Sequence, residues 1–438
     1  MLTKWKNKSI LILGLGKEGI ETYKFLRKIF PEKILGVGDR EEIKNEKLKI
    51  KNEKQIRWHL GKDYLKAIKN YDVIIKSPGI AIHFPEIEKA YKEGKIVSPT
   101  QLFFENCPGK IVGVTGTKGK STTTALIYKI LKENGIKAHL VGNIGKPALS
   151  LLFWGKSNDV YVYELSCHQL YRLKKSPHIS VFLNIYPEHL DYYQNLKEYV
   201  SAKTNITRYQ TKNDYLIFNS SDKIIKEIAE KSKAKKIPIS TDKKVDLFSA
   251  CRKSQLRGTF NFLNIAAAIK VGGIFKVPKK IIAGAIKNFK PLPHRLEFVG
   301  IFKGIAFYND ALSTIPETAI AALDTLGKNV QTIILGGYER NLDFTQLAER
   351  ILKSGIKNVI LFPTTGKRIW QKICQLSKKN LPNHFFAASM TEAVKISYKY
   401  TAKGKICLLS TASPSFGIFK DYKEKGGLFK KYIKKFAK

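Results

Sequence analysis

KIVGVTGTKGKSTTT, residues 110–124, combines the pattern of a strand, a glycine-rich turn and a helix start in one short run. Residues 111–115 are apolar and mostly β-branched, which predicts a strand, and a helix is predicted from Lys120 onwards. Backbone N–H groups in such a turn, together with the helix N-terminus, form a cavity for phosphate oxygens. Lys120 adds a positive charge there, and Ser121 adds a hydroxyl that Mg²⁺ can bind. The run therefore predicts a binding loop for ATP or GTP.

The spacing departs from the usual G-x-x-x-x-G-K-[S/T], because Val114 stands five positions before Gly119. Only a shorter G-x-x-G-K-S remains, and the alternative interpretation is an ordinary glycine turn between a strand and a helix. Glycine, lysine and serine in this order after a strand favour nucleotide binding. The expected nucleotide contacts in the loop are Gly116, Thr117, Lys118, Gly119, Lys120, Ser121 and Thr122.

The chain is strongly basic, with a net charge of +42 from 78 Lys+Arg against 36 Asp+Glu. Such a balance raises nucleic acid or a membrane surface as a partner. Lysine is, however, scattered through every segment, with no arginine-rich arm and no zinc-finger spacing. Small polyanionic substrates explain the charge as well, and we expect no nucleic-acid partner. The lysine-rich tail, residues 430–438, predicts a solvated helix end.

The five cysteines are far apart and form no C-x-x-C pair, so neither a disulfide framework nor a cysteine-based zinc site is predicted. This pattern fits the cytoplasm. The N-terminal apolar run is short and lacks a small-residue cleavage site, so residues 9–13 predict a first strand and no signal peptide. No stretch approaches the roughly 20 apolar residues that cross a bilayer, so no membrane insertion is expected.

Strand patterns alternate with helical patterns along the whole chain, which predicts an α/β fold with parallel sheets. We expect three domains: Rossmann-like over residues 1–106, P-loop ATPase-like over 107–291 and Rossmann-like over 292–438. The expected strand segments include ILILG (10–14), ILGVG (34–38), VIIKSPG (73–79), YVYEL (161–165), ISVFLNI (179–185), TIILGG (332–337), NVILF (358–362) and KICLLS (405–410).

The first block carries a second glycine motif. Gly14, Gly16 and Gly19 form G-x-G-x-x-G after a strand, and Asp39 ends the next strand, as in dinucleotide-binding proteins. An NAD(P)-dependent dehydrogenase is therefore an alternative function. The chain already has an ATP loop in a separate block and shows no hydride-transfer constellation. Because the same backbone holds any diphosphate, a UDP-type ligand is favoured over NAD(P) and over a purely structural turn.

Other candidate residues follow the strands of the central block. Glu164 ends a buried-looking strand, where a carboxylate can hold Mg²⁺ opposite Ser121, although a strand-end acid can also simply face solvent. His189 lies between Glu188 and Asp191 and could complete a metal site, although a lone histidine is more often structural. Further candidate site residues are Lys203, Asn261 and Asn264. Each is weak evidence when taken alone, because single lysines and asparagines are usually surface or turn residues.

Taken in order, these motifs closely resemble the Mur ligase family, ATP-dependent amide-bond-forming enzymes that build the peptidoglycan precursor. The resemblance covers nearly the whole chain, whereas folylpolyglutamate synthases share the later motifs but lack such a first block. Its segments are GLGKEG (14–19), SPGI (77–80), TGTKGKST (115–122), GNIG (142–145), ELSCHQL (164–170), EHLD (188–191), LPHR (292–295), YNDALST (308–314), LGG (335–337) and STASPSFGIF (410–419).

The resemblance implies a cytoplasmic, monomeric enzyme that joins D-glutamate to UDP-N-acetylmuramoyl-L-alanine through an acyl phosphate, using ATP and one or two Mg²⁺ ions. It implies catalytic roles for Lys120, Lys203 and His189, with Lys203 carbamylated. Implied metal ligands are Ser121, Glu164, His189 and Lys203. Implied nucleotide contacts are Asn261, Asn264, Arg295 and Asp310. Implied UDP contacts are Leu15, Lys17, Asp39, Arg40, Ser77 and Gly79, with Asn143 at the muramoyl-alanine end and Thr314 and Ser415 at glutamate.

Three departures from the family pattern cluster at the amino-acid side. Leu312 stands where a lysine usually meets a substrate carboxylate, Phe260 stands in place of a histidine, and residues 413–417 differ from the common form. These changes leave L-glutamate open as the alternative amino acid, with D-glutamate favoured.

Overall fold

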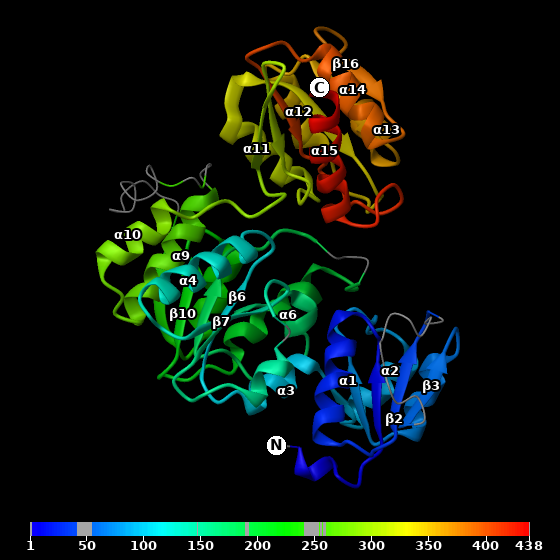
Figure 1. The fold of residues 1–438 in the computed structure, drawn as a ribbon, viewed down its shortest axis with the longest axis vertical. Coiled ribbons are helices and arrows are strands. Elements are labelled where there is room, and N and C mark those ends of the chain that lie inside the picture. The colour runs from blue at the N-terminus through cyan, green and yellow to red at the C-terminus, as the bar shows by residue number, and fades with distance from the viewer. Residues whose placement is uncertain are drawn as a thin grey trace. The chain divides into compact units, whose positions relative to one another are not determined.

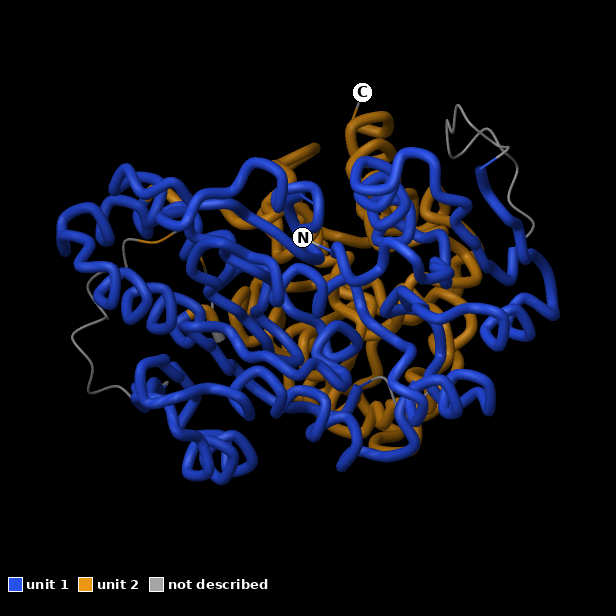
Figure 2. Tube along the Cα trace, turned by 90° about the horizontal axis from the view of Figure 1, so that it is seen from below, with its two compact units in different colours: residues 1–253, 262–287 blue, residues 254–261, 288–438 orange. Residues whose placement is uncertain are grey.

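The computed structural model describes residues 2–41, 55–146, 148–188, 192–240, 254, 256 and 260–437 (Figure 1). The chain forms two compact units (Figure 2). The first comprises Met1–Lys253 and Phe262–Lys287, and the second Ser254–Asn261 and Asn288–Lys438. Together they contain three sheets, so the predicted α/β fold with mostly parallel sheets is confirmed. The expected domain boundaries stay a prediction.

The first sheet of unit 1 has five parallel strands in the order β3-β2-β1-β4-β5. Strand β1 lies at its centre and is buried along its whole length, as its unbroken apolar sequence predicts. The elements are η1 (Thr3–Trp5), β1 (Ile10–Leu13), α1 (Lys17–Ile29), β2 (Leu35–Asp39), β3 (Ile56–Leu60), η4 (Tyr64–Asn70), β4 (Val73–Lys76), α2 (Pro85–Lys92), β5 (Ile96–Val97) and α3 (Pro99–Asn106).

The second sheet of unit 1 has six parallel strands in the order β11-β10-β9-β6-β8-β7. Strand β6 lies between β8 and β9, so the glycine turn after it and the ends of both neighbours share one edge. The elements are β6 (Lys110–Thr115), α4 (Lys120–Glu133), β7 (Ala138–Gly142), η5 (Leu149–Phe153), β8 (Val160–Glu164), α5 (Cys167–Leu170), β9 (Ile179–Phe182), α6 (Leu196–Arg208), β10 (Tyr215–Asn219), α7 (Lys223–Lys231), β11 (Lys235–Ile239), α9 (Phe260–Ile274) and α10 (Lys279–Lys287).

The sheet of unit 2 has the order β12-β13-β17-β14-β15-β16, and only its edge strand β12 pairs antiparallel. Separate apolar clusters, one containing Leu347 and the other Phe429, bury residues of the sheet. The elements are β12 (Glu297–Phe302), β13 (Ile305–Asn309), α11 (Pro316–Leu326), η6 (Gly327–Asn329), β14 (Val330–Gly336), α12 (Thr345–Leu352), β15 (Asn358–Phe362), α13 (Thr365–Leu376), β16 (Asn383–Phe386), α14 (Met390–Tyr400), β17 (Ile406–Leu409) and α15 (Tyr422–Ala437).

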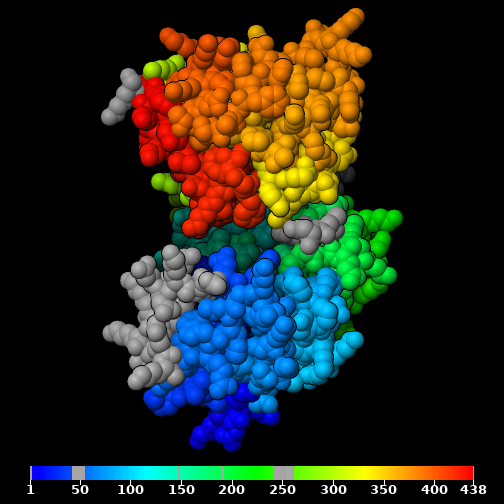
Figure 3. Space-filling view, turned by 90° about the vertical axis from the view of Figure 1, so that its right-hand side faces the viewer, coloured from blue at the N-terminus to red at the C-terminus, as the bar shows by residue number. Residues whose placement is uncertain are grey.

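Within the described ranges, no helix is both long enough and apolar enough to span a bilayer. In Figure 3 the residues of α15, drawn in red, form part of the surface of unit 2. Because the strands of each sheet are mostly parallel, polar side chains that follow different strands gather at one edge.

Candidate active site

The glycine turn between β6 and α4 is held by the segment that follows β9. The Asn184 carbonyl oxygen accepts from the Thr117 amide at 2.9 Å, and its side-chain oxygen accepts from the Lys118 amide at 2.8 Å. Gly119 has a φ of 86°, and a Cβ there would overlap the side-chain oxygen of Asn264. Both the backbone conformation and the close approach therefore require glycine at this position.

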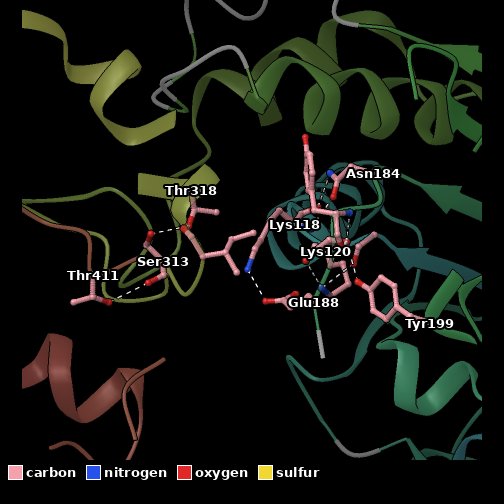
Figure 4. Close-up of polar contacts among 12 residues, drawn as sticks. Lys118, Lys120, Asn184, Glu188, Tyr199, Ser313, Thr318 and Thr411 are labelled. Atoms are coloured by element: carbon pink, nitrogen blue, oxygen red, sulfur yellow. Dashed lines mark hydrogen bonds and ion pairs between the residues drawn. The ribbon is translucent and has the colours of Figure 1, made fainter. Parts of the chain in front are cut away.

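Lys120 opens α4 and folds back over the turn. Its Nζ donates to the carbonyl oxygens of Gly116 (3.0 Å) and Thr117 (2.9 Å), and burial lowers its pKa. An ammonium group beside a helix N-terminus makes this turn strongly attractive to phosphate. Figure 4 shows Lys118 pointing to Glu188, with its Nζ 3.0 Å from Oε1.

Lys203 lies on α6 and is 1% exposed. Its Nζ donates to the carbonyl oxygen of Gly116 at 3.0 Å and lies 4.9 Å from the ring centroid of Tyr199. Burial lowers the pKa of Lys203 to about 8. The predicted catalytic lysines Lys120 and Lys203 thus share the Gly116 carbonyl, which places both amines at the phosphate turn.

Glu164 ends β8 and is 3% exposed. Its buried Oε2 has no hydrogen-bond partner within the described ranges. A buried carboxylate oxygen without a donor is costly, and a divalent cation would satisfy it, so the residue fits Mg²⁺. Among the described residues, no three His, Cys, Asp or Glu side chains form a metal cluster. The predicted ligand His189 lies outside the described residues.

The N-terminal glycine turn is tied to the ends of both neighbouring strands. The Leu15 amide donates to Asp39 Oδ2 at 2.6 Å, and the Ser77 hydroxyl donates to the Gly14 carbonyl oxygen at 2.7 Å. A Cβ at Gly19 would overlap that same carbonyl, so α1 packs directly on the turn. Arg40 and Gly79 are exposed beside it.

One cavity of about 550 Å³ in unit 1 joins the two glycine turns. It brings residues predicted for the UDP-sugar together with the two buried lysines predicted for ATP and metal. The predicted residues in its lining are Lys17, Asp39, Ser77, Gly79, Lys120, Asn143 and Lys203. Residues predicted for the UDP-sugar and residues predicted for ATP and metal therefore face the same space.

Unit 2 contains a separate cavity of about 620 Å³. It brings together Asn261 and Arg295, two of the predicted nucleotide contacts, with Phe298 and Tyr308 in the same lining. Asn264, one helical turn further along α9, instead accepts from the Thr123 hydroxyl at 3.1 Å in unit 1. Each unit thus holds one of the two asparagines predicted to contact adenine. The side chain of Phe260 lies outside the described residues.

Asp310 follows β13 in unit 2. Its Oδ1 accepts from the Leu296 amide at 3.0 Å, its Oδ2 accepts from the Ser410 hydroxyl at 2.8 Å, and burial raises its pKa to about 6. Thr314 is half-buried on the same edge, and Ser415 is 6% exposed with an Oγ that has no partner in the described part of the chain. A buried hydroxyl in that state can accept a ligand hydrogen bond.

Comparison with known proteins identifies the family. Residues 8–98 match the Mur ligase MurD-like N-terminal domain, and residues 114–272 match the Mur ligase middle domain. A UDP-N-acetylmuramoylalanine–D-glutamate ligase of Acetivibrio thermocellus is 32% identical and covers 98% of the chain and 97% of its own length. The chain belongs to the Mur ligase family. A relative of the same name from Clostridium tetani is also 32% identical, with the same coverage.

Solved structures agree with this assignment at the level of the fold. A UDP-N-acetylmuramate–alanine ligase from Thermotoga maritima superposes with a TM-score of 0.61 at 18% identity, covering 98% of this chain and 99% of its own. A MurF ligase from the same organism, in complex with ADP, has a TM-score of 0.61 at 16% identity and covers 97% and 95%. The predicted family and fold are confirmed, and like other Mur ligases the chain is an ATP-dependent, amide-bond-forming enzyme.

The structure of this Mur ligase also brings to the N-terminal turn residues that the sequence did not single out. Lys76 is 4% exposed, and its Nζ donates to the Ile80 carbonyl oxygen at 2.7 Å. The Tyr192 hydroxyl lies 3.0 Å from the carbonyl oxygens of both Pro78 and Ile80. Residues 77–80 are therefore held from two sides. A lysine at a strand end ordinarily predicts a surface position, so the sequence carries no signal for this role.

Proposed function

We propose that the chain joins D-glutamate to UDP-N-acetylmuramoyl-L-alanine, converting ATP to ADP and phosphate, in the cytoplasmic stage of peptidoglycan precursor synthesis. The observation that carries the proposal is the single cavity shared by the N-terminal glycine turn, Lys120 and Lys203. Relatives named for this reaction are 32% identical over almost the whole chain. We further propose that the enzyme acts as a monomer.

The UDP-sugar would bind at the N-terminal turn. The N-terminus of α1 and Lys17 favour the diphosphate by their charge, and Asp39 and Ser77 fix the backbone that approaches it. Asn143, in the same cavity, would contact the muramoyl-alanine end. The remaining proposed contacts are Leu15, Arg40 and Gly79.

ATP would bind at the central turn, with its β- and γ-phosphates at residues 116–122. Asn261, Asn264, Arg295 and Asp310 are the proposed contacts to the rest of the nucleotide. Ser121, Glu164, His189 and a carbamylated Lys203 would hold one or two Mg²⁺ ions. Bound there, Mg²⁺ would neutralise phosphate charge, and the unpartnered Oε2 of Glu164 supports this assignment.

The reaction needs no nucleophile from the protein. An oxygen of the L-alanine carboxylate attacks the γ-phosphorus of ATP, which forms an acyl phosphate and releases ADP. The neutral amine of glutamate then attacks the acyl carbon, loses a proton and expels phosphate as the amide forms. Lys120 stabilises the charge of the transferring phosphoryl group, and the cavity walls orient the two substrates.

D-glutamate is favoured as the amino acid because relatives named for it match the whole chain. L-glutamate is the alternative, since Leu312 supplies no cation for a substrate carboxylate. In our proposal the buried hydroxyl of Ser415 and the half-buried Thr314 bind the incoming amino acid. The dehydrogenase alternative loses its support, because the chain belongs to a ligase family.

Phosphate release tests the proposal. With ATP, Mg²⁺ and UDP-N-acetylmuramoyl-L-alanine, we expect release that depends on D-glutamate and is weak or absent with L-glutamate or no amino acid. Release driven by L-glutamate alone would establish the alternative. Folded enzyme that binds ATP but releases no phosphate with either enantiomer would contradict the proposed substrate.

A further inference from the structure

Lys425 is a buried cation that none of the proposed steps uses. It lies in the first turn of α15 in unit 2 and is 1% exposed. Its Nζ donates to the Thr411 hydroxyl oxygen at 2.6 Å. A buried ammonium group is costly unless a hydrogen bond and an opposite charge compensate it, so its surroundings indicate what it stabilises.

Thr411 connects Lys425 to two segments of the sheet edge. The Thr411 hydroxyl shares its proton between the carbonyl oxygens of Ser313 (3.0 Å) and Ser413 (3.1 Å), and it accepts from Lys425. Figure 4 shows Thr411 pointing to Ser313. These contacts hold Ser313, which precedes Thr314, and Ser413, which lies two residues before Ser415. Thr314 and Ser415 are the two residues proposed to bind glutamate.

The Asp310 carboxylate is the negative charge that acts on the buried Lys425 ammonium group. The attraction between the two groups raises the pKa of Lys425 and lowers that of Asp310, although burial dominates and leaves them at about 7 and about 6. The other groups that act on Asp310 are the Arg295 guanidinium, the Ser410 hydroxyl and the Leu296 amide. Each charge therefore favours the charged form of the other.

The rest of α15 contacts the segment that carries Arg295. The Asn309 side-chain amide donates to the Gly426 carbonyl oxygen at 3.3 Å, and Lys430 Nζ lies 2.9 Å from Glu297 Oε1. Glu297 Oε2 in turn accepts from the His294 amide at 2.9 Å. Helix α15 thus contacts residues next to Asp310 and Arg295 and stabilises their backbone.

We propose that Lys425 is a positioning residue for ligation, which holds Asp310 and residues 411–415 in place through its charge and through Thr411. Because Lys425 is 1% exposed and does not line either cavity described above, it acts through these neighbours and not on the substrate. The inference rests on the proposed function, since it assigns Asp310 to the nucleotide.

Lys425→Met tests the inference. We expect kcat/KM for ATP to fall about 10- to 100-fold, as misplacement by about 1 Å does elsewhere. We also expect the acid limb of its pH profile to move up by about one unit, because Asp310 loses a nearby cation. Asp310→Asn should abolish the acid limb of the pH profile, and Lys425→Arg should leave the limb at its wild-type pH. Thr411→Val should lower kcat/KM without shifting the acid limb.

Lys434→Met is the matched control, because it removes an exposed lysine from the same helix. It should change neither kcat/KM for ATP nor the pH of the acid limb. Circular dichroism spectra and thermal unfolding like those of the wild type check that each variant is folded. A folded Lys425→Met variant with the wild-type kcat/KM and the wild-type acid limb would overturn the inference while leaving the proposed function intact. If that variant does not fold, wild-type behaviour of Thr411→Val would overturn it. An inactive wild-type enzyme would instead contradict the proposed function.

Discussion

Lys203→Ala is expected to lower ligation about 10²- to 10³-fold, and a short-chain carboxylic acid is expected to restore part of the activity. The amine of Lys203 is buried at the Gly116 carbonyl, and its pKa of about 8 leaves a growing neutral fraction as the pH rises through 8. Only a neutral amine adds CO₂, forming a carbamate and releasing a proton. The alanine variant loses that carboxylate, and acetate or propionate in the vacated space supplies another.

Phosphate release with increasing acetate measures the rescue. Lys197→Ala is the matched control, because Lys197 is an exposed lysine on the same helix α6, and its activity should not change with acetate. An inactive Lys203→Ala that no carboxylic acid rescues would contradict the carbamate assignment.

Lys120→Met is expected to lower kcat about 10³-fold, because it removes the cation that stabilises charge on the transferring phosphoryl group. Its Nζ is held by two backbone carbonyl oxygens, which fixes the cation at the turn. Single-turnover kinetics would separate this loss from weaker ATP binding.

Lys129→Met provides the control for Lys120. Lys129 lies on the same helix α4, where its Nζ is 2.6 Å from Glu133 at the surface. Surface ion pairs contribute about 0–1 kcal/mol, so this variant should keep its rate and fold. A Lys120→Met enzyme with wild-type kcat would contradict the phosphate assignment.

The central strands of all three sheets were predictable, because each is a continuous apolar run between a turn and a helix. Strands β1, β6 and β14 are buried on nearly every residue and stand out in the sequence. Edge strands are different. Strand β16 is largely exposed and β12 pairs antiparallel, so neither carries the pattern of a buried parallel strand.

The candidate site was predictable where a motif fixes the backbone. The Gly116 turn and the Gly14 turn both lie at strand ends, and some of the residues predicted around them, among them Lys17, Lys120 and Lys203, line one cavity. Roles that depend on long-range packing had no such signal. The sequence carried no prediction for Lys425, which α15 buries against Thr411 through a contact that only the folded sheet creates.

The most direct test of the account follows oxygen from substrate to phosphate. UDP-N-acetylmuramoyl-L-alanine labelled with oxygen-18 in its carboxyl group would be incubated with the enzyme, ATP, Mg²⁺ and D-glutamate. We expect one labelled oxygen in each phosphate released, because the carboxylate takes up the phosphoryl group before the amide forms. Phosphate without label would mean that water attacks ATP, and it would contradict the acyl-phosphate mechanism.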